Sequence, residues 1–282
     1  MYNFSIGVIL DSFRKPFLEA LDTVQAIGAQ GIQVYATRGE MSPENLVGEK
    51  RRNFLKEVKA RGLVISALCG DLGHGFGHAD QNPALIEKSK RILDLAKDLE
   101  TDIVTTHIGV VPENADHPRY KIMQDACGEL AAYADSVKAH FAIETGPETS
   151  LVLKNFLDTL HSTGVSVNLD PANLVMVTGD DPAGAVHNLK DYIVHTHAKD
   201  GKMLRRANPE AIYGLIRDDA LVTDPAFIEV PLGEGSVPYE AYLKALDDIG
   251  YKGFLTIERE VGDDPVADIV SSVQFLRDVL AK

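Results

Sequence analysis

This sequence has few cysteines, a shortage of basic residues and no long apolar run, and each absence narrows its possible functions. Its 282 residues include only two cysteines, which cannot form a disulfide framework and which fit a reducing compartment. The 28 lysine and arginine residues are outnumbered by 42 acidic residues, which gives a formal net charge of -14. Since neutralising nucleic-acid phosphates takes clustered basic side chains, this balance disfavours a nucleic-acid partner.

Two further absences bear on where the protein works. No stretch of about 18 consecutive apolar residues occurs, so we expect no membrane span. The segment from Met1 to Phe4 lacks the charged and then apolar regions of a secretory signal. We therefore expect a cytoplasmic protein that does not work at a membrane.

What the sequence does contain is an alternation of short β-rich runs and longer amphipathic segments. Between the β-rich runs, apolar residues recur at helical spacing, as in the segment that begins at Asn82-Pro83. Another helix is predicted to open at Ser42-Pro43-Glu44, with serine at the N-cap and proline at the first helical position. The β-rich runs predict eight strands at residues 5–10, 31–35, 63–68, 102–108, 141–144, 165–169, 192–198 and 253–258.

Eight strand-then-helix units are what a closed parallel barrel requires. An open doubly wound sheet shows the same alternation, but it usually carries a glycine-rich phosphate turn after its first strand. Here the first strand runs into residues 11–15, which contain no glycine. Parallel barrels typically have about 250 residues, and 45% hydrophobic content can fill such a core. We predict an α/β fold with a single (β/α)8 TIM-barrel domain over residues 1–282.

One segment interrupts this rhythm. About forty residues, from Asp200 to Val237, separate the seventh strand from the helix that follows it. Loops of that length in a compact domain are usually lids or binding loops. We therefore predict a lid-like loop at about 200–237, in which residues 209–217 could form a short helix.

Four of the predicted strands end in a side chain that can bind a metal ion. Glu144, Asp170, His197 and Glu258 lie about 26, 27 and 61 residues apart, each at or near the end of an apolar run. In a parallel barrel the carboxyl ends of the strands face one common cup, where chemistry takes place. Carboxylates with one imidazole suit Mn²⁺, Mg²⁺, Co²⁺ or Zn²⁺, and the lack of a cysteine ligand argues against a closed structural zinc site. The sequence thus predicts an enzyme with one divalent metal ion.

The motifs that contain these residues resemble the sugar phosphate isomerase/epimerase family of the xylose isomerase-like TIM-barrel superfamily. The resemblance extends over essentially the whole chain, and the order and spacing of the motifs carry it. The matching pieces are residues 142–145, 168–173, the H-x-H-x-K-D pattern at 195–200, the glycine-rich turn at 231–235, and residues 250–258.

The resemblance implies a role for each of the four residues. It implies that Glu144, Asp170, His197 and Glu258 are the metal ligands. It also implies that the two glutamates act as catalytic acid and base, exchanging protons on opposite faces of a bound ketose while the ion polarises the carbonyl. The expected activity is that of an isomerase or epimerase of a sugar, a sugar phosphate or a related polyol ketone, acting through a metal-stabilised enediolate, and the expected partner is therefore a small carbohydrate substrate. A homo-oligomer remains open, as do the identity of the sugar and whether it is phosphorylated.

Other residues near the predicted strand ends are candidates for binding substrate. His107 ends the fourth strand, and Lys199 and Asp200 follow the seventh. Asn173 could contact substrate or cap the turn after the sixth strand. His195 lies deeper than His197 on the same strand face and could be a packed core histidine. Weaker candidates are Gln33, Tyr35, Cys69, Glu260, Arg119 and Arg259, together with the loop residues Asp71, His74 and His78.

Three alternatives to an isomerase or epimerase remain. A metal-dependent lyase on the same barrel would remove water from a keto-inositol or a dehydroshikimate-type substrate. An apurinic endonuclease-like phosphodiesterase would need a further histidine three residues after Asp170, where this chain has Asn173. A non-catalytic metal-binding or ligand-binding protein would leave the four candidate ligands and the long loop unexplained.

Overall fold

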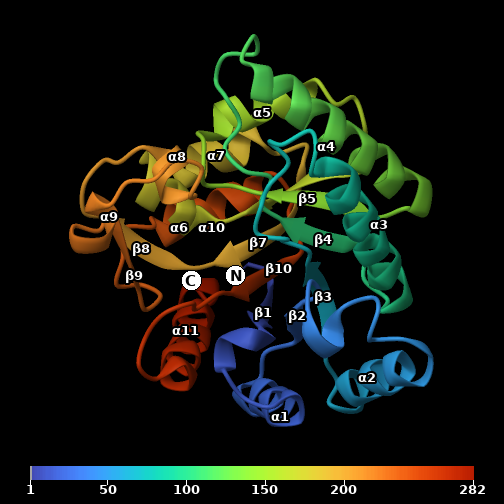
Figure 1. Cartoon of the computed structure of the whole chain (residues 1–282). Helices are drawn as coiled ribbons and strands as arrows, with labels where there is room; N and C mark the ends of the chain where they lie inside the picture. Colours follow the sequence, from blue (N-terminus) through green and yellow to red (C-terminus); the bar gives the residue numbers. More distant parts are fainter. Residues whose placement is uncertain (1) are drawn as a thin grey trace.

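The computed structural model, which describes residues 2–282, confirms the predicted closed barrel (Figure 1). Eight parallel strands form a ring in the order β1-β10-β7-β6-β5-β4-β3-β2, and a separate two-stranded sheet is formed by β8 and β9. The barrel strands are β1 (Ser5–Ile9), β2 (Gly31–Tyr35), β3 (Val64–Cys69), β4 (Ile103–Thr106), β5 (His140–Glu144), β6 (Val165–Leu169), β7 (Ile193–Ala198) and β10 (Phe254–Ile257).

Helices surround the ring and cover the outer faces of the strands (Figure 1). The longer ones are α1 (Phe17–Ile27), α2 (Gly48–Ala60), α3 (Asn82–Asp98), α4 (Pro118–Val137), α5 (Ser150–Asp158), α7 (Pro182–Asn188), α10 (Tyr239–Asp248) and α11 (Pro265–Leu280). A short turn, α6 (Pro171–Asn173), follows β6 and continues into a π-helical turn over Leu174–Thr178. The two ends of the chain meet, because the backbone N–H of Tyr2 donates to the carbonyl of Leu280 at 3.2 Å.

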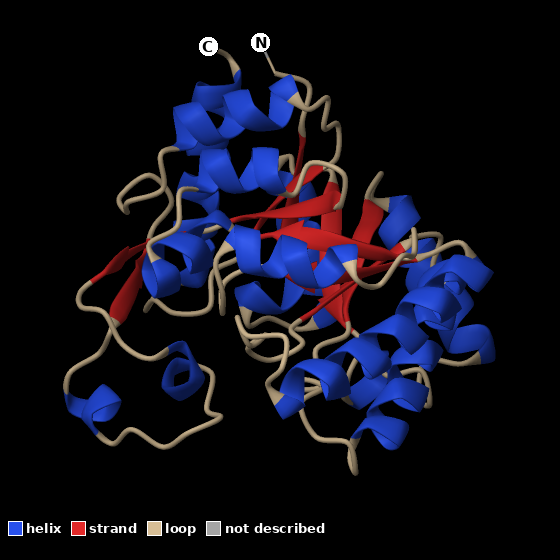
Figure 2. Cartoon of the chain, turned by 90° about the horizontal axis from the view of Figure 1, so that it is seen from above, coloured by secondary structure: helices blue, strands red, loops and turns tan. Residues whose placement is uncertain are grey.

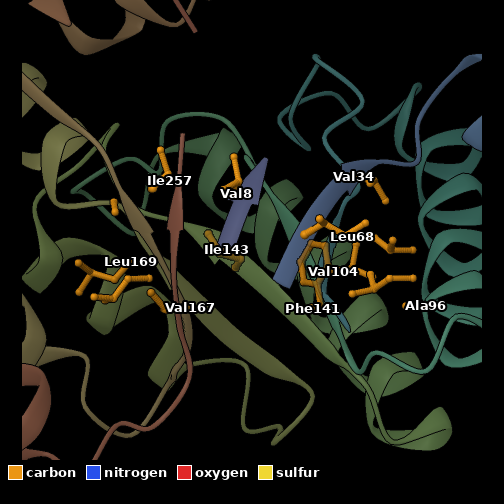
Figure 3. Packing of buried hydrophobic residues seen from close by; sticks show 14 of the residues in the cluster. Val8, Val34, Leu68, Ala96, Val104, Phe141, Ile143, Val167, Leu169 and Ile257 are labelled. Carbon is orange, nitrogen blue, oxygen red and sulfur yellow. The ribbon is translucent and has the colours of Figure 1, made fainter. Parts of the chain in front are cut away.

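Apolar side chains of the barrel strands pack against the helices, whereas the inner face also holds buried polar side chains such as Gln33, Thr105 and Asn168. Figure 3 shows Leu68, Val104 and Phe141 gathered beside Ala96 of helix α3, on the outer face of the sheet. Each large apolar side chain that is fully buried in this way stabilises the fold by about 1.5–3 kcal/mol. The barrel is therefore a rigid support for the polar side chains at its rim.

The prediction of a helix opening at Ser42 is wrong, since α2 begins only at Gly48. A 3-10 turn over Gly39–Met41 precedes Ser42, and the Ser42 hydroxyl donates back to the carbonyl of Gly39 at 3.1 Å. The hydroxyl is thus engaged with the preceding turn and caps no helix. Local capping preference is a weak signal that neighbouring turns can override.

The predicted long loop contains regular structure. β8 (Asp200–Met203) pairs antiparallel with β9 (Phe227–Val230), and the chain between them forms two helical turns, α8 (Pro209–Ile212) and α9 (Ala220–Thr223). Figure 2 shows this two-stranded sheet set apart from the barrel strands, with the short helices in the loops beyond it. The helix expected over 209–217 is therefore shorter than predicted.

Two irregularities in the barrel register lie beside the rim residues. The pairing of β2 with β3 shifts between Ile32 and Gln33, and that of β6 with β7 shifts between Val167 and Asn168. Such shifts change the direction in which the next side chain points and are common next to active sites. Gln33 and Asn168, which follow the two shifts, both contact His197.

Over residues 2–282, no helix has the length and apolar character needed to cross a bilayer.

Candidate metal centre and active site

The four predicted ligands converge at the carboxyl ends of their strands. Glu144 is the last residue of β5, Asp170 follows β6, His197 lies in β7 and Glu258 follows β10. One donor atom from each lies within 4.8 Å of the others, and all four side chains are buried. The Nδ1 atom of His197 lies 3.5 Å from Glu144 Oε1, 3.5 Å from Asp170 Oδ2 and 3.2 Å from Glu258 Oε2. Four positions far apart in the sequence therefore form one buried cluster.

The donor set and the state of Asp170 fit a divalent cation. Asp170 Oδ1 accepts the backbone N–H of Asn173 at 2.8 Å and so caps the α6 turn. Its Oδ2 atom is buried and has no hydrogen-bond partner among the described residues. Burial raises the pKa of Asp170, because its charged form is poorly solvated there. Ligand atoms each about 2.0–2.4 Å from one ion lie at most about 4.8 Å apart, and the four donor atoms all lie within 4.8 Å of one another.

A glutamine orients the imidazole of His197. Gln33 Oε1 lies 3.0 Å from His197 Nε2 and can accept its proton, while Gln33 Nε2 donates to Thr105 Oγ1 at 2.9 Å. This pairing turns Nδ1 towards the carboxylates, as partners of metal-binding histidines commonly do. Burial opposes protonation of His197, but Glu258 and Glu144 outweigh burial and hold its pKa well above the usual value. A proton and a cation would therefore compete for the same nitrogen.

Glu144 lies among hydrogen-bond donors. Its Oε2 accepts from Asn168 Nδ2 at 3.2 Å and its Oε1 from Asn173 Nδ2 at 3.1 Å. His107 Nε2 lies 3.7 Å from Oε1, and His107 Nδ1 lies 3.3 Å from Asp71 Oδ2. Burial alone would raise the pKa of Glu144, but His107 and His197 hold it below the usual value. Burial likewise disfavours the charged form of His107, yet Glu144 and Asp71 raise the pKa of His107 to about 9.

Glu258 has a different partner on the other side of the cluster. Lys199 Nζ lies 3.1 Å from Glu258 Oε2 and 2.7 Å from Glu260 Oε2, and its side chain is only 5% exposed. Burial would raise the pKa of Glu258, but Lys199 and His197 hold it well below the usual value. The two glutamates thus sit in different surroundings, one beside a histidine and amides, the other beside an ammonium group.

His195 is a packed core histidine, as its deeper position on the strand suggested. Its Nδ1 lies 2.8 Å from Asn168 Oδ1 and its Nε2 lies 2.9 Å from Thr256 Oγ1. Burial lowers the pKa of His195 well below the usual value, so its ring is neutral. It supports Asn168, which in turn contacts His197 and Glu144.

A cavity of about 240 Å³ opens next to the cluster. His107, Lys199 and Asn173 line it, as do Tyr35 and Glu260. Asp200 does not line it, because its carboxylate accepts four backbone N–H groups of its own region. Of the weaker candidates, Gln33, Cys69 and Asp71 also line the cavity, whereas Arg119 and Arg259 do not. His74 and His78 line a neighbouring hollow that shares Asp71 and His107 with the cavity.

Several lining residues could not be recognised from the sequence. Ile212, Tyr213, Phe227 and Glu229 come from the excursion after β7, and Met176 comes from the turn after α6. Tyr213 reaches over His107, with ring centroids 5.6 Å apart. The length of the loop after β7 was the one sign in the sequence that it contributes to the site, since no periodic pattern or motif marks these side chains.

Comparison with known proteins agrees with this architecture. The family model for the xylose isomerase-like TIM barrel matches residues 21–279, and the chain belongs to that family.

Solved structures of the same fold include proteins with different reactions. The chain is similar to a xylose isomerase domain protein from Planctomyces limnophilus, with a TM-score of 0.77, 23% identity and coverage of 99% of this chain and 96% of that one. A probable 3-DHS dehydratase from Bacillus anthracis gives a TM-score of 0.71 at 20% identity, covering 97% and 99%. A D-psicose 3-epimerase from Clostridium cellulolyticum H10, solved with D-tagatose, gives a TM-score of 0.72 at 14% identity, covering 98% and 99%. At these identities the likeness shows the shared fold, and the reaction has to be argued from the site.

Proposed function

We propose that this protein is a divalent-metal-dependent isomerase or epimerase of a sugar or a related polyol ketone. The observation that carries the proposal is the pair Glu144 and Glu258, held at one point by strands that lie three places apart in the ring. Because β5 and β10 are not neighbours, the two carboxylates approach that point from different directions. Two bases on different sides of a bound carbon are what removal and return of a proton on opposite faces require.

The neighbouring residues would prepare this site for proton transfer. Asn168 and Asn173 hold the Glu144 carboxylate in place, and Lys199 does the same for Glu258. Glu144, Asp170, His197 and Glu258 would hold the ion, which when bound polarises the substrate carbonyl and makes the adjacent C–H more acidic. Both glutamates have pKa values held below the usual range, so each is ionised and able to accept a proton.

Substrate hydroxyl groups would be bound by the polar residues of the cavity. His107, Asn173 and Lys199 line it and would donate to these hydroxyl groups, and Tyr213 with Phe227 would cover the apolar face of a sugar ring. The volume of about 240 Å³ lies below the roughly 300–1,000 Å³ of pockets for drug-sized ligands, which favours a monosaccharide-sized molecule.

A lyase is the second candidate, and His107 is the residue that favours it. The pKa of His107 is raised to about 9, so the ring carries a proton at neutral pH next to Glu144. An acid at that position could protonate a departing β-hydroxyl, as a dehydratase of a keto-inositol or a dehydroshikimate-type substrate requires.

Solvent-deuterium exchange distinguishes these reactions. The full chain is loaded in turn with Mn²⁺, Co²⁺, Mg²⁺ or Zn²⁺ and incubated in D₂O with a panel of ketoses, scyllo-inosose and 3-dehydroshikimate. Uptake of deuterium at carbon without loss of water supports the epimerase or isomerase, whereas loss of water from the product supports the lyase. No exchange and no product with any metal or substrate would contradict both.

Two substitutions assign the proton transfer. Glu144→Gln and Glu258→Gln should each lower turnover by about 10³-fold or more, since a neutral amide cannot accept the proton. Glu49→Gln in the exposed face of α2 is the matched control and should retain full activity. Circular dichroism and thermal unfolding check that each variant is folded. Retained activity in either glutamine variant contradicts the assignment.

A further inference from the structure

We infer that the site accepts an uncharged polyhydroxy ketone and discriminates against its phosphorylated or carboxylated counterparts. The inference rests on the proposed function and narrows its substrate class. Two independent features carry it: the turn that would bind a phosphate is filled by a side chain of the protein, and the cations near the cavity are paired with carboxylates.

The glycine-rich turn at Pro231–Gly235 already binds an anion from within the protein. In TIM barrels a phosphate group is frequently held by backbone N–H groups in the loops after the seventh and eighth strands. Here the loop after β7, the seventh barrel strand, presents the N–H groups of Gly233, Gly235 and Val237, which donate to the Asp200 carboxylate at 3.0, 3.0 and 3.1 Å.

Asp200 leaves no room in this turn for another anion. Asp200 is only 2% exposed, and its carboxylate accepts a further hydrogen bond from the backbone N–H of Gly201 at 2.9 Å. A Cβ atom built on Gly235 would overlap the Asp200 carboxylate, so the turn is closed tightly around it. The oxygens of Asp200 therefore occupy the donors that phosphate oxygens would need.

Lys199, the one lysine or arginine that lines the cavity among the described residues, is also engaged. Its ammonium group lies between Glu258 at 3.1 Å and Glu260 at 2.7 Å, with Glu229 at 3.9 Å. Three carboxylates for one ammonium leave no net positive charge for a ligand. Lys199 can still donate to a neutral hydroxyl, because an ammonium group has three protons.

The two candidate arginines are paired as well. The guanidinium of Arg259 lies 2.6 Å from Glu229 and 2.8 Å from Asp268, and its side chain is 8% exposed. Arg119 pairs with Glu210 on α8, away from the cavity lining. Using either arginine for a phosphate would require breaking an existing ion pair and leaving a carboxylate partly buried without its partner.

The balance of charge around the cavity is therefore negative. Six carboxylates belong to the cluster or the cavity lining: Asp71, Glu144, Asp170, Glu229, Glu258 and Glu260. Lys199, Arg259 and a bound divalent ion together do not neutralise all of them. A phosphate dianion or a substrate carboxylate would enter against this potential, whereas a neutral polyol would find many acceptors for its hydroxyl protons.

Matched pairs of ligands test the inference on the manganese-loaded full chain. The pairs are D-fructose with D-fructose 6-phosphate, D-xylulose with D-xylulose 5-phosphate, and D-fructose with the carboxylate D-fructuronate. Each member is measured twice, by kcat/KM for deuterium exchange or dehydration and by calorimetric Kd. We expect the neutral member to be favoured by about tenfold or more in each pair that responds. A charged member that binds or reacts better than its neutral partner overturns the inference.

The two readouts separate failure of the inference from failure of the proposed function. If no ligand reacts but neutral members bind better than charged ones, the proposed reaction fails and the charge selectivity stands. If charged members react faster, the reaction stands and the selectivity fails. If no neutral member binds, the inference is overturned as well.

A charge variant checks the physical cause. Glu260→Gln removes one negative charge beside Lys199, so the preference for the neutral member should fall by about three- to tenfold. Glu49→Gln removes the same charge from the exposed face of α2 and should leave the ratio unchanged. An unchanged ratio in Glu260→Gln, with the variant folded by thermal unfolding, contradicts an electrostatic origin of the selectivity.

Discussion

Replacing Asp170 with asparagine should change stability in opposite directions with and without a metal ion. Asp170 is fully buried, its Oδ2 atom has no hydrogen-bond partner within residues 2–282, and the carboxylates of Glu144 and Glu258 belong to the same cluster. A buried polar oxygen without a partner destabilises the fold by about 1–3 kcal/mol. Asparagine keeps the Oδ1 acceptor for the backbone N–H of Asn173 and removes the charge. The metal-free variant should therefore be more stable than the metal-free wild type.

The size of both effects follows from the length of the chain. An unfolding entropy of about 2.1 cal/mol/K per residue gives roughly 0.6 kcal/mol/K for 282 residues. A gain of about 1–3 kcal/mol then raises the unfolding temperature of the metal-free Asp170→Asn protein by about 2–5 °C. A divalent ion at about 100 times its Kd stabilises the wild type by about 2.7 kcal/mol, or about 4–5 °C. In Asp170→Asn the metal-induced shift should fall below about 1 °C.

Differential scanning calorimetry with and without Mn²⁺, after treatment with a chelator, measures both shifts. The matched control is Asp191→Asn, which makes the same change at an exposed position just before β7, at the opposite end of the strand from the cluster. This control should unfold within about 1 °C of the wild type and keep the full metal-induced shift, since exposed substitutions change stability by only about 0.5 kcal/mol. An Asp170→Asn protein that keeps the wild-type metal shift, or that is less stable without metal, would refute the reasoning.

Two further predictions concern residues outside the cluster. Burial raises the pKa of Glu148 to about 8. Between about pH 4.5 and 8 the unfolded chain therefore loses a proton that the folded chain keeps. The free energy of unfolding that Glu148 contributes declines as the pH rises through this range. In Glu148→Gln the free energy of unfolding should decline by about 3–5 kcal/mol less between pH 5 and pH 8 than in the wild type, as measured by urea unfolding. Identical pH profiles for the variant and the wild type would exclude this role of Glu148. Asp200→Asn places an amide NH₂ against backbone donors and should lower the free energy of unfolding by about 2–4 kcal/mol, whereas an unchanged thermal midpoint would show that the turn does not depend on the charge.

The fold was readable from the sequence because its signals are local. The barrel strands appear as short β-rich runs that are largely buried, and the longer helices repeat their apolar residues at helical spacing. The start of α2 was not predictable, because a hydroxyl such as that of Ser42 can cap a helix or bond to a preceding turn with similar energy. The helical turns α8 and α9 in the loop after β7 could not be predicted either, since segments of four residues are too short to show a helical period.

The site was readable to the extent that barrel topology determines it. The carboxyl ends of parallel strands meet at one rim, so Glu144, Asp170, His197 and Glu258 could be grouped from their places in the strands alone. The partner that turns His197 could not be found in this way. Gln33 reaches His197 Nε2 from a strand 164 positions away in the sequence, after a register shift that no pattern announces.

Asp200 shows, in a single residue, the difference between what the sequence predicts and what the tertiary structure decides. Its position after His197 in the H-x-H-x-K-D pattern suggested a contact with substrate, but its carboxylate accepts N–H groups from residues up to 37 positions away. The sequence by itself determined the barrel, the convergence of the four candidate ligands and the existence of a long loop after β7, because these follow from local periodicity and from the order of strands. Only the tertiary structure decided which side chains orient the ligands, which acids are paired and which anion fills the glycine-rich turn. Those outcomes depend on distances between segments remote in the chain, which packing alone establishes.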